Sequence, residues 1–340
     1  MKENKKPLII LTGPTAVGKT ELSLELAERI GGEIISADSM QVYRHMDIGS
    51  AKIRPEEMDG VPHHLIDVLE PWEEFHVVRF QQLVKEAMAG IYERGHIPIL
   101  TGGTGFYIQA IVKDIDFTEN GEDSSYRENL ERRAREEGCE ALHRELAAVD
   151  PESAAQIHPN NVKRIIRALE YYEQTGQPIF AHNEEQKEKP SPYNYAYFVL
   201  TDDREVLYER IDRRVDQMLS DGLVEEVKRL RAMGCSRELV SMQGLGYKEI
   251  LAYLEGEMSL EEAIYVLKRD TRHFAKRQLT WFRREKEVIW LDKREFDRQE
   301  ERILEKMLDI CHAKNILPIS EISNSMNTDC MTGDKQSFKS

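Results

Sequence analysis

The residues best suited to chemistry lie near the start of the chain, in the run GPTAVGKT at positions 13–20. Gly13, Gly18, Lys19 and Thr20 fit the pattern G-x-x-x-x-G-K-[ST], which binds phosphate groups when it follows a strand and opens a helix. The glycines let successive backbone N–H groups turn toward one anion, and the helix adds its positive N-terminal end. Lys19 would contact the outer phosphate and the Thr20 hydroxyl would help to hold Mg²⁺. We therefore predict a phosphate site; a surface turn that matches by chance is the alternative.

Two further polar groups follow apolar runs that are typical of buried strands. Asp38 ends the run at 33–37, and Thr104 lies in the glycine-rich loop at 102–105, after the run at 97–100. In open α/β sheets the carboxyl ends of the strands converge on the ligand crevice, so we expect Asp38 to lie close to the phosphate loop. A cap of a helix or turn is the structural alternative for Asp38. The glycine-rich loop would let a ligand approach the backbone, and Thr104 adds a hydroxyl.

The elements that must position these groups alternate between strand and helix, which is typical of a parallel sheet covered by helices. The predicted fold class is α/β, with a P-loop NTPase-like parallel sheet core and helices on both faces. Strands are expected from residue 7 and at 33–37, 63–68, 97–100, 195–200 and 288–291, and helices at 19–30, 74–93, 204–230 and from 259. The segment at 40–53 looks too polar and irregular for the core, and we expect its Gln41, Tyr43 and Arg44 to contact a substrate.

The length of 340 residues leaves room for about two domains. Near residue 114 the sequence becomes polar and the α/β alternation stops, and helical patterns follow at 126–149 and 158–175. We therefore predict an inserted all-helical domain at 116–194 within a discontinuous core formed by 1–115 and 195–315. The tail at 316–340 lacks apolar periodicity and is predicted to be disordered.

The composition excludes several classes of protein. With 40% hydrophobic and 32% charged residues, the chain resembles soluble globular proteins, and no apolar run approaches the roughly 20 residues that span a bilayer. Cys139, Cys235, Cys311 and Cys330 form no C-x-x-C pair, which favours a reducing cytoplasm and argues against a structural zinc site. The pair His63 and His64 has no further ligands at metal-binding spacing, so a strand edge or a loop is the favoured interpretation.

The net charge of −15 argues against a nucleic-acid partner in general, but a binding surface is local. The basic strip at 268–286, KRDTRHFAKRQLTWFRREK, interleaves lysine and arginine with aromatic residues, a composition that suits an RNA backbone and its bases. Lys163, Arg164 and Arg167 share one side of a predicted helix and suit a polyanion equally well. A solvated helix face is the alternative for both segments. Arg210, Arg213 and Arg214 could neutralise a departing phosphate, although surface ion pairing is the usual role.

Seven segments in order along the chain resemble one family. GPTAVGKT, SADSMQVYR, LTGGTGFY, HPNNVKRIIRALE, ERIDRRVDQML, GLGYKE and TRHFAKRQLTWFR are similar to the bacterial tRNA dimethylallyltransferases, also called isopentenyl-tRNA transferases. The resemblance covers roughly residues 7–291. It implies transfer of a dimethylallyl group from dimethylallyl diphosphate to N6 of the adenosine 3′-adjacent to the anticodon. Diphosphate leaves, and ATP is not consumed.

The resemblance also implies roles for individual residues. Asp38 would be the general base, Thr104 would contact the reacting centre, and Mg²⁺ would lie near Thr20. The diphosphate would be bound by Gly13, Pro14, Thr15, Ala16, Val17, Gly18, Lys19, Thr20 and Arg214. The tRNA would be contacted by Asp38, Ser39, Met40, Gln41, Thr104, Arg127, Lys163, Arg164, Ile165, Ile166, Arg167, Gln243, Gly246, Tyr247, Lys248, His273, Lys276, Arg277 and Gln278.

The expected partners are therefore dimethylallyl diphosphate and the anticodon stem-loop of tRNA, bound by a cytoplasmic monomer without a membrane partner. The resemblance makes RNA contact the favoured interpretation of the basic strip. Two other classes remain open. A small-molecule or nucleoside kinase would use the same loop for ATP, and a non-catalytic RNA-binding module would carry the loop as a relic.

Overall fold

The computed structural model describes residues 5–117 and 125–317 and divides into two compact units. The first, here called the sheet unit, comprises Met1–Glu74, Glu86–Thr104 and Asn194–Ser340 within the described ranges. The second, the helical unit, comprises Phe75–Lys85 and Gly105–Tyr193. Of the segment at 116–194 that the sequence assigns to an inserted domain, the described residues up to Tyr193 lie in the helical unit, which also takes in 75–85 and 105–115.

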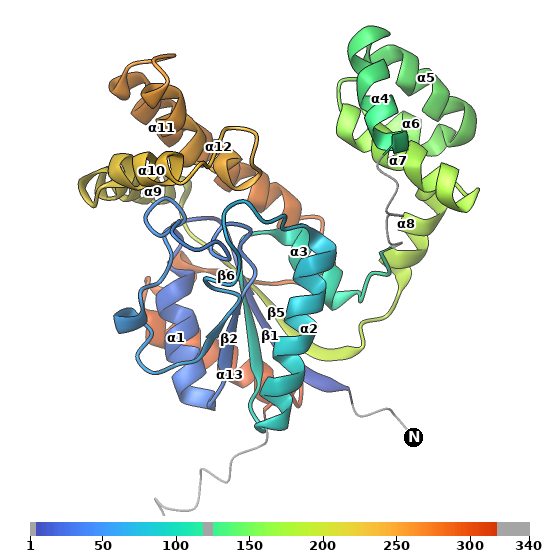
Figure 1. The fold of residues 1–340 in the computed structure, drawn as a ribbon. Coiled ribbons are helices and arrows are strands. Elements are labelled where there is room, and N and C mark those ends of the chain that lie inside the picture. The colour runs from blue at the N-terminus through green and yellow to red at the C-terminus, as the bar shows by residue number, and fades with distance from the viewer. Residues whose placement is uncertain (1–4, 118–124, 318–340) are drawn as a thin grey trace, which may run out of the picture. The chain divides into compact units, whose positions relative to one another are not determined.

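The sheet unit is built on a six-stranded sheet (Figure 1). Its strands, in the order β3-β2-β4-β1-β5-β6, are β1 (Lys6–Thr12), β2 (Glu33–Ser36), β3 (His63–His64), β4 (Pro98–Gly102), β5 (Tyr193–Thr201) and β6 (Ile289–Asp292). The pairs β1–β4, β2–β4, β2–β3 and β5–β6 are parallel, with Ile9 opposite Ile99 in the first of them. This order confirms the predicted α/β core and brings β5, late in the chain, next to the first strand.

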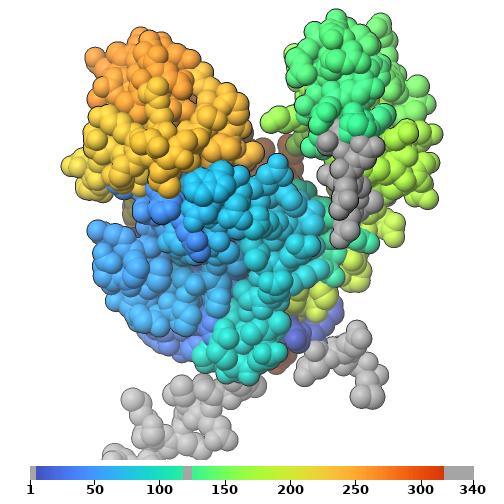
Figure 2. All heavy atoms as spheres, in the orientation of Figure 1, coloured from blue at the N-terminus to red at the C-terminus, as the bar shows by residue number. Residues whose placement is uncertain are grey.

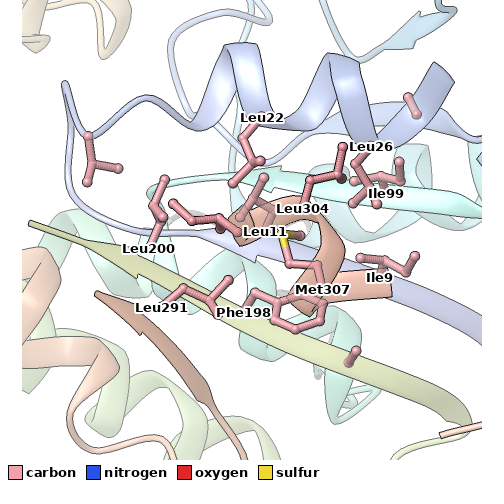
Figure 3. Packing of buried hydrophobic residues seen from close by; sticks show 14 of the residues in the cluster. Ile9, Leu11, Leu22, Leu26, Ile99, Phe198, Leu200, Leu291, Leu304 and Met307 are labelled. Atoms are coloured by element: carbon pink, nitrogen blue, oxygen red, sulfur yellow. The ribbon is translucent and has the colours of Figure 1, made fainter. Parts of the chain in front are cut away.

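Both faces of the sheet are covered, as its uninterrupted apolar strands require. Successive side chains of β1 point to opposite faces, and Leu8, Ile9, Ile10 and Leu11 are all fully buried. Figure 3 shows one of these faces, where Ile9 and Leu11 pack with side chains of β4, β5, β6, α1 (Lys19–Ile30) and α13 (Glu300–Ala313). The apolar stripe of α1 is thereby fixed beneath the phosphate loop that precedes it.

The remaining helices of the sheet unit come from the second half of the chain. They are α9 (Arg204–Ser220), α10 (Leu223–Ala232), α11 (Tyr247–Leu254) and α12 (Leu260–Phe282). The long α12 begins with a capping box, in which the Ser259 side chain accepts from the Glu262 backbone N–H. The predicted helix at 204–230 is two helices, because Gly222 adopts a left-handed conformation between α9 and α10. Helix α2 (Val77–Glu93) runs through both units, and the Tyr92 hydroxyl near its end donates to the Pro7 carbonyl.

The helical unit contains α3 (Gly105–Val112), α4 (Ser125–Glu136), α5 (Cys139–Val149), α6 (Pro151–Gln156), α7 (Val162–Thr175) and α8 (Ile179–Glu188). Its core is formed by Leu130, Leu142, Leu146, Ile165 and Leu169, among others. The predicted helix at 126–149 is interrupted, since Gly138 caps the start of α5 with a positive φ of 87°. The short α6 and α8, like α13 of the sheet unit, were not predicted.

Three predictions are corrected. The segment at 40–53 contributes to the core, because Val42, Tyr43 and Met46 are fully buried; Tyr43 therefore cannot meet a substrate as expected. The predicted strand at 63–68 ends after His64, because positive φ angles at residues 65 and 67 break the extended conformation. In the tail, residues 316 and 317 are buried rather than disordered, and residues 318–340 lie outside the described residues.

At the opposite end of β2 from Asp38, the buried carboxylate of Glu33 joins three elements. It accepts two hydrogen bonds from Arg94, at 2.8 and 2.7 Å, and one each from the rings of His64 and His96, both at 2.7 Å. The Arg94 guanidinium is the main cause that lowers the pKa of Glu33 to about 2, and the two histidines add to it against the opposing effect of burial. His64 thus serves a buried acid at the sheet edge, as the non-metal interpretation of the histidine pair expects.

None of the helices in the described ranges combines the length and apolar character needed to cross a membrane. Within the same ranges Cys139, Cys235 and Cys311 are free thiols, whereas Cys330 lies outside them.

The Glu33 cluster predicts a pH-dependent stability. Glu33→Gln should lower the free energy of unfolding by about 2 kcal/mol at pH 7, because a buried acceptor of four hydrogen bonds loses its charge. The wild-type advantage should shrink as the pH falls from 4.5 toward 2, since the unfolded carboxylate takes up a proton first. Urea unfolding at pH 7 and at pH 4 measures both effects. Glu301→Gln, which removes an exposed partner of Arg29, is the control and should change little; equal losses in the two variants would contradict the prediction.

Candidate functional site

The phosphate loop joins β1 to α1 in the predicted strand–loop–helix context. Gly13 leaves β1 with a φ of 149°, and a Cβ atom there would lie 2.3 Å from the carbonyl oxygen of Leu200 in β5. No larger residue fits this position. The loop therefore begins in a conformation that only glycine allows, pressed against the neighbouring strand.

The Lys19 side chain folds back onto the phosphate loop. Its Nζ donates to the carbonyl oxygens of Gly13 at 3.1 Å and Pro14 at 2.8 Å. Burial, reinforced by the nearby guanidinium of Arg214, lowers the pKa of Lys19 to about 8, while Asp38 and Glu21 act in the opposite direction. Two cations thus share one poorly solvated region. A bound anion would neutralise the repulsion between them.

Arg214 comes from α9, far along the chain. Burial also lowers its pKa, and the carboxylates of Asp38 and Glu21 oppose this effect. Among the described residues its guanidinium has no hydrogen bond or ion pair. The side chain is therefore available to a ligand, unlike Arg210 one turn earlier, whose Nη1 lies 3.4 Å from the Val17 carbonyl and 3.9 Å from Asp202.

Lys293 is a cation of the site that the sequence interpretation missed. It follows β6 directly and is only 2% exposed; its Nζ donates to Glu300 at 2.8 Å and to the Val17 carbonyl at 3.4 Å. Val17 of the phosphate loop is therefore contacted by two cationic side chains, from α9 and from the end of β6. The rule that placed Asp38 near the site, the convergence of strand carboxyl ends, would also have found Lys293.

Asp38 both caps a turn and lines the cavity. Its Oδ1 accepts from the backbone N–H of Met40 at 2.8 Å and of Gln41 at 3.4 Å, which is the turn cap named as the alternative. The carboxylate nevertheless lines the cavity, and in the described part of the chain its Oδ2 has no hydrogen-bond partner. The turn fixes one oxygen and leaves the other for a ligand. Gln41 is fixed as well, through Ser36 at 3.0 Å and the Ala51 carbonyl at 3.4 Å.

These groups line one cavity of about 1020 Å³, which lies within the sheet unit. Residues 15–20 of the phosphate loop, Asp38, Gln41, Arg214 and Gln278 all contribute. Gly13, Pro14 and Thr104 are not among the lining residues; the lining from the glycine-rich loop ends at Gly103, next to Thr104. Apolar walls come from Leu24, Ile53 and Phe274, which the sequence interpretation did not assign to the site.

Gln278 of α12 connects two loops. Its Oε1 accepts from the backbone N–H of Thr15 at 2.9 Å, and its Nε2 donates to the Gly103 carbonyl at 3.0 Å. The side chain is almost fully buried. The residue was expected to contact tRNA, whereas here its amide holds the phosphate loop and the glycine-rich loop together.

The basic strip divides into two halves along α12. In the first half, Lys268 pairs with Asp216 and Arg272 with Asp212 of α9, so these charges are neutralised within the unit. In the second half, Lys276, Arg277 and Arg284 have no ion pair within the described ranges. Together with His273, Thr280 and Trp281 these three line a second, open cavity of about 480 Å³. The charges of the first half are thus paired within the unit, whereas those of the second half face solvent and stay available to a ligand.

Other expected tRNA contacts of the sheet unit differ in exposure. Tyr247 is fully buried and donates its hydroxyl to Glu226, so its side chain cannot reach an RNA. Gln243 is exposed, Gly246 is buried at the start of α11, and Lys248 lies 3.5 Å from Glu249. Ser39 and Met40 belong to the turn at Asp38 and are half-buried.

In the helical unit, α7 presents Lys163 and Arg164 to solvent, and within the described residues neither has an ion pair. Ile165 and Ile166 are corrected: their side chains lie in the core of the unit and support the helix instead of facing a ligand. Arg127 forms a double hydrogen bond with the buried Glu170, at 2.7 and 2.6 Å. Arg167 is half-buried, which lowers its pKa.

Comparison with known proteins gives one consistent family. The model of the IPP transferase family matches residues 41–285. The tRNA dimethylallyltransferase of Lachnoclostridium phytofermentans is 64% identical over 92% of this chain and 99% of its own, and that of Carboxydothermus hydrogenoformans is 51% identical over 91% and 99%. The crystal structure of a tRNA isopentenylpyrophosphate transferase from Bacillus halodurans is similar with a TM-score of 0.69, 48% identity and coverage of 92% and 98%. A eukaryotic dimethylallyltransferase acting on tRNA is similar with a TM-score of 0.80, 30% identity and coverage of 93% and 81%.

The two hydrogen bonds of Gln278 predict that it controls the shape of the phosphate loop. Gln278→Ala should weaken binding of an alkyl diphosphate about tenfold, because the Thr15 amide and the Gly103 carbonyl lose their shared partner. Calorimetric titration measures this effect. Gln217→Ala, which removes an exposed glutamine of α9, is the matched control and should leave binding unchanged. Wild-type affinity in Gln278→Ala would show that the loops keep their shape without it.

Proposed function

Because the chain belongs to the IPP transferase family, we infer that it is a prenyltransferase that acts on tRNA. It transfers a dimethylallyl group to N6 of the adenosine 3′-adjacent to the anticodon, and dimethylallyl diphosphate is the donor that we propose. The observation that carries the proposal is the meeting of a phosphate loop, Arg214 and the carboxylate of Asp38 in one cavity. The first two suit the diphosphate, and the carboxylate suits the amine that attacks.

The leaving diphosphate determines what the phosphate loop must do. N6 attacks C1 of the donor, the allylic C–O bond breaks, and its electron pair stays on the diphosphate. Backbone N–H groups of residues 15–20, together with Lys19 and Arg214, would stabilise this developing charge, and a poorly solvated site makes such interactions strong. The loop thus binds the leaving group of the reaction, whereas the corresponding loop of a kinase binds the phosphoryl donor.

Mg²⁺ fits the same region. The Thr20 hydroxyl is exposed in the first turn of α1 and lines the cavity. Mg²⁺ usually takes one or two protein oxygens and completes its shell with phosphate oxygens and water, so one hydroxyl beside a diphosphate is an adequate donor set. We propose that Thr20 holds the ion, which would supply further neutralisation of the leaving charge.

The acceptor needs a base, since the lone pair of N6 is delocalised into the purine. We propose Asp38 for this role, because the turn occupies its Oδ1 and leaves Oδ2 to accept the proton. General-base catalysis of this kind contributes about 10²- to 10⁴-fold. Thr104 follows the cavity-lining Gly103 directly, and we propose that its hydroxyl orients the adenosine. Leu24, Ile53 and Phe274 offer apolar walls for the five-carbon chain.

The target base must leave its stack in the anticodon loop before its N6 can react. Cationic side chains that form no ion pair among the described residues suit the RNA backbone, namely Lys276 and Arg277 on α12, Arg284 just after it, and Lys163 and Arg164 on α7. We further propose that the enzyme works in the cytoplasm, where tRNA is available. We also propose that it works as a monomer, because every group named above comes from one chain.

Asp38→Asn separates the chemistry from binding. Asparagine can still accept the turn hydrogen bonds at its Oδ1 but cannot take a proton, so kcat should fall about 10²- to 10⁴-fold while tRNA affinity stays close to wild type. The measurement is transfer of label from radiolabelled dimethylallyl diphosphate to tRNA in the presence of Mg²⁺, with a filter-binding assay for affinity. Asp59→Asn, at another carboxylate of the cavity, is the control. Absence of label in RNA with the wild type would overturn the proposed function, and a collapse of tRNA affinity in Asp38→Asn would make Asp38 an RNA-positioning residue.

The lowered pKa of Lys19 predicts that binding of the prenyl donor depends on pH. The lysine is charged below its pKa of about 8, and only the charged form attracts the diphosphate. As the lysine deprotonates, affinity for dimethylallyl diphosphate should therefore fall to about half at pH 8 and by about tenfold at pH 9. Calorimetry without tRNA measures this decline. Lys19→Met should bind weakly and show no such decline; a wild-type affinity that is flat from pH 7 to 9.5 would contradict the prediction.

A further inference from the structure

Glu226 of α10 is buried outside the cavity, and neither the sequence interpretation nor the proposed mechanism uses it. It is 1% exposed, yet its carboxylate is fully occupied by hydrogen bonds. Oε2 accepts from the backbone N–H groups of Asp47 at 3.0 Å and Ile48 at 2.9 Å, and Oε1 accepts from that of Gly49 at 3.1 Å and from the Tyr247 hydroxyl at 2.9 Å. A carboxylate offers about four acceptor positions, so this one has no capacity left for a ligand.

Three consecutive backbone N–H groups that point at one anion form a concave turn, which in other proteins holds phosphate or a metal cluster. Here the anion is a side chain of the same protein. Gly49 also lies directly against the Tyr247 ring, where a Cβ would be 2.5 Å from Cζ. The turn at 47–49 is therefore shaped by two residues that lie far along the sequence, Glu226 and Tyr247. Figure 2 shows the surface of this region, where the blue segment near residue 50 meets the yellow α10.

The residues that follow the turn form a wall of the cavity. Ser50, Ala51, Lys52 and Ile53 all line it. The Ala51 carbonyl accepts from the Gln41 side chain at 3.4 Å, and the backbone N–H of Gln41 is one of the two donors to Asp38. A continuous set of contacts thus leads from Glu226, through the turn and the wall, to the turn that holds Asp38.

The other side of this segment is held by a buried lysine. Lys52 donates to the Tyr43 carbonyl at 2.7 Å and to the carboxylates of Asp47 and Asp67, both at 2.6 Å. These contacts tie the segment to its own neighbourhood in the chain. Of the partners named for this segment, only Glu226 of α10 and Tyr247 of α11 come from outside its own neighbourhood. These two side chains therefore position the wall against α10 and α11.

We propose that Glu226, assisted by Tyr247, is a positioning residue for the cavity wall at 50–53 and, through Gln41, for Asp38. This inference rests on the proposed function, since it assigns the wall to the donor and acceptor of that reaction. Glu226 touches no substrate; it sets the turn from which the wall starts. Tyr247 accordingly acts from within the protein, in place of the RNA contact first expected of it.

Glu226→Gln tests the proposal because it keeps the shape of the side chain and removes its charge. The kcat/KM for dimethylallyl diphosphate should fall about tenfold or more, because this factor corresponds to the loss of one charge-assisted hydrogen bond. Binding of inorganic pyrophosphate, which depends on residues 13–20 and Arg214, should be unchanged, and its stoichiometry counts the folded sites. Hydrogen–deuterium exchange should accelerate in peptides that contain 47–49. Tyr247→Phe should show the same changes to a smaller degree, since it removes one of four donors. Glu225→Gln is the matched control, because Glu225 is an exposed neighbour on the same helix that pairs with Lys228.

The outcomes are distinguishable. Loss of turnover per pyrophosphate-binding site, with faster exchange confined to the turn, supports the positioning role. If activity falls only in proportion to the number of binding sites, Glu226 merely stabilises the fold and the proposal is overturned. Wild-type turnover with wild-type exchange in Glu226→Gln overturns it as well. If the wild-type enzyme itself transfers no label to tRNA, the proposed function fails, and this result is seen before any variant is compared.

Discussion

The site depends on one close contact, at the point where the chain leaves β1. Gly13 lies so near the Leu200 carbonyl of β5 that no side chain could be accommodated. Because β1 is held between β4 and β5, this contact fixes both the position and the direction of the phosphate loop. The apolar stripe of α1 then packs against the same sheet, so the loop is held at its two ends by the core. Its backbone N–H groups are thereby arranged before any phosphate arrives, which is what makes such donors effective.

The charges around this loop are balanced in an unusual way. A protein with a net charge of −15 concentrates Lys19, Arg214 and Lys293 in one poorly solvated cavity. Lys293 is neutralised by Glu300 and serves the loop, whereas Arg214 has no partner in the described part of the chain. Burial lowers the pKa values of both Lys19 and Arg214, the Arg214 guanidinium lowers that of Lys19 further, and the nearby carboxylates offset these effects only in part. A bound diphosphate would offset the repulsion between the two cations with its negative charge. The repulsion therefore favours binding of the anion.

Two buried polar side chains from the second half of the chain hold the loops of the site in place. Gln278 of α12 ties the phosphate loop to the glycine-rich loop, and Glu226 of α10 holds the turn that leads into the cavity wall. Each replaces the water that a backbone N–H or C=O group would otherwise need. Such groups are costly to leave unpaired in the interior, so the loops have one favourable arrangement. The precision of the site is therefore a property of the folded sheet unit as a whole.

The sequence by itself determined the α/β core, the strand–loop–helix around Lys19 and the position of Asp38 at a strand end, because these depend on local periodicity and on the general rule that strand ends converge. It also determined that the basic strip lies on a helix. Only the tertiary structure decided which cations are available, since pairing of Lys268 and Arg272 with α9 depends on how two helices pack. It likewise buried Tyr43, Tyr247, Ile165 and Ile166, whose types suit either a core or a surface. The roles of Lys293, Gln278 and Glu226 came from contacts between segments up to 276 positions apart, and no local pattern in a single sequence records which distant backbone groups a side chain will meet.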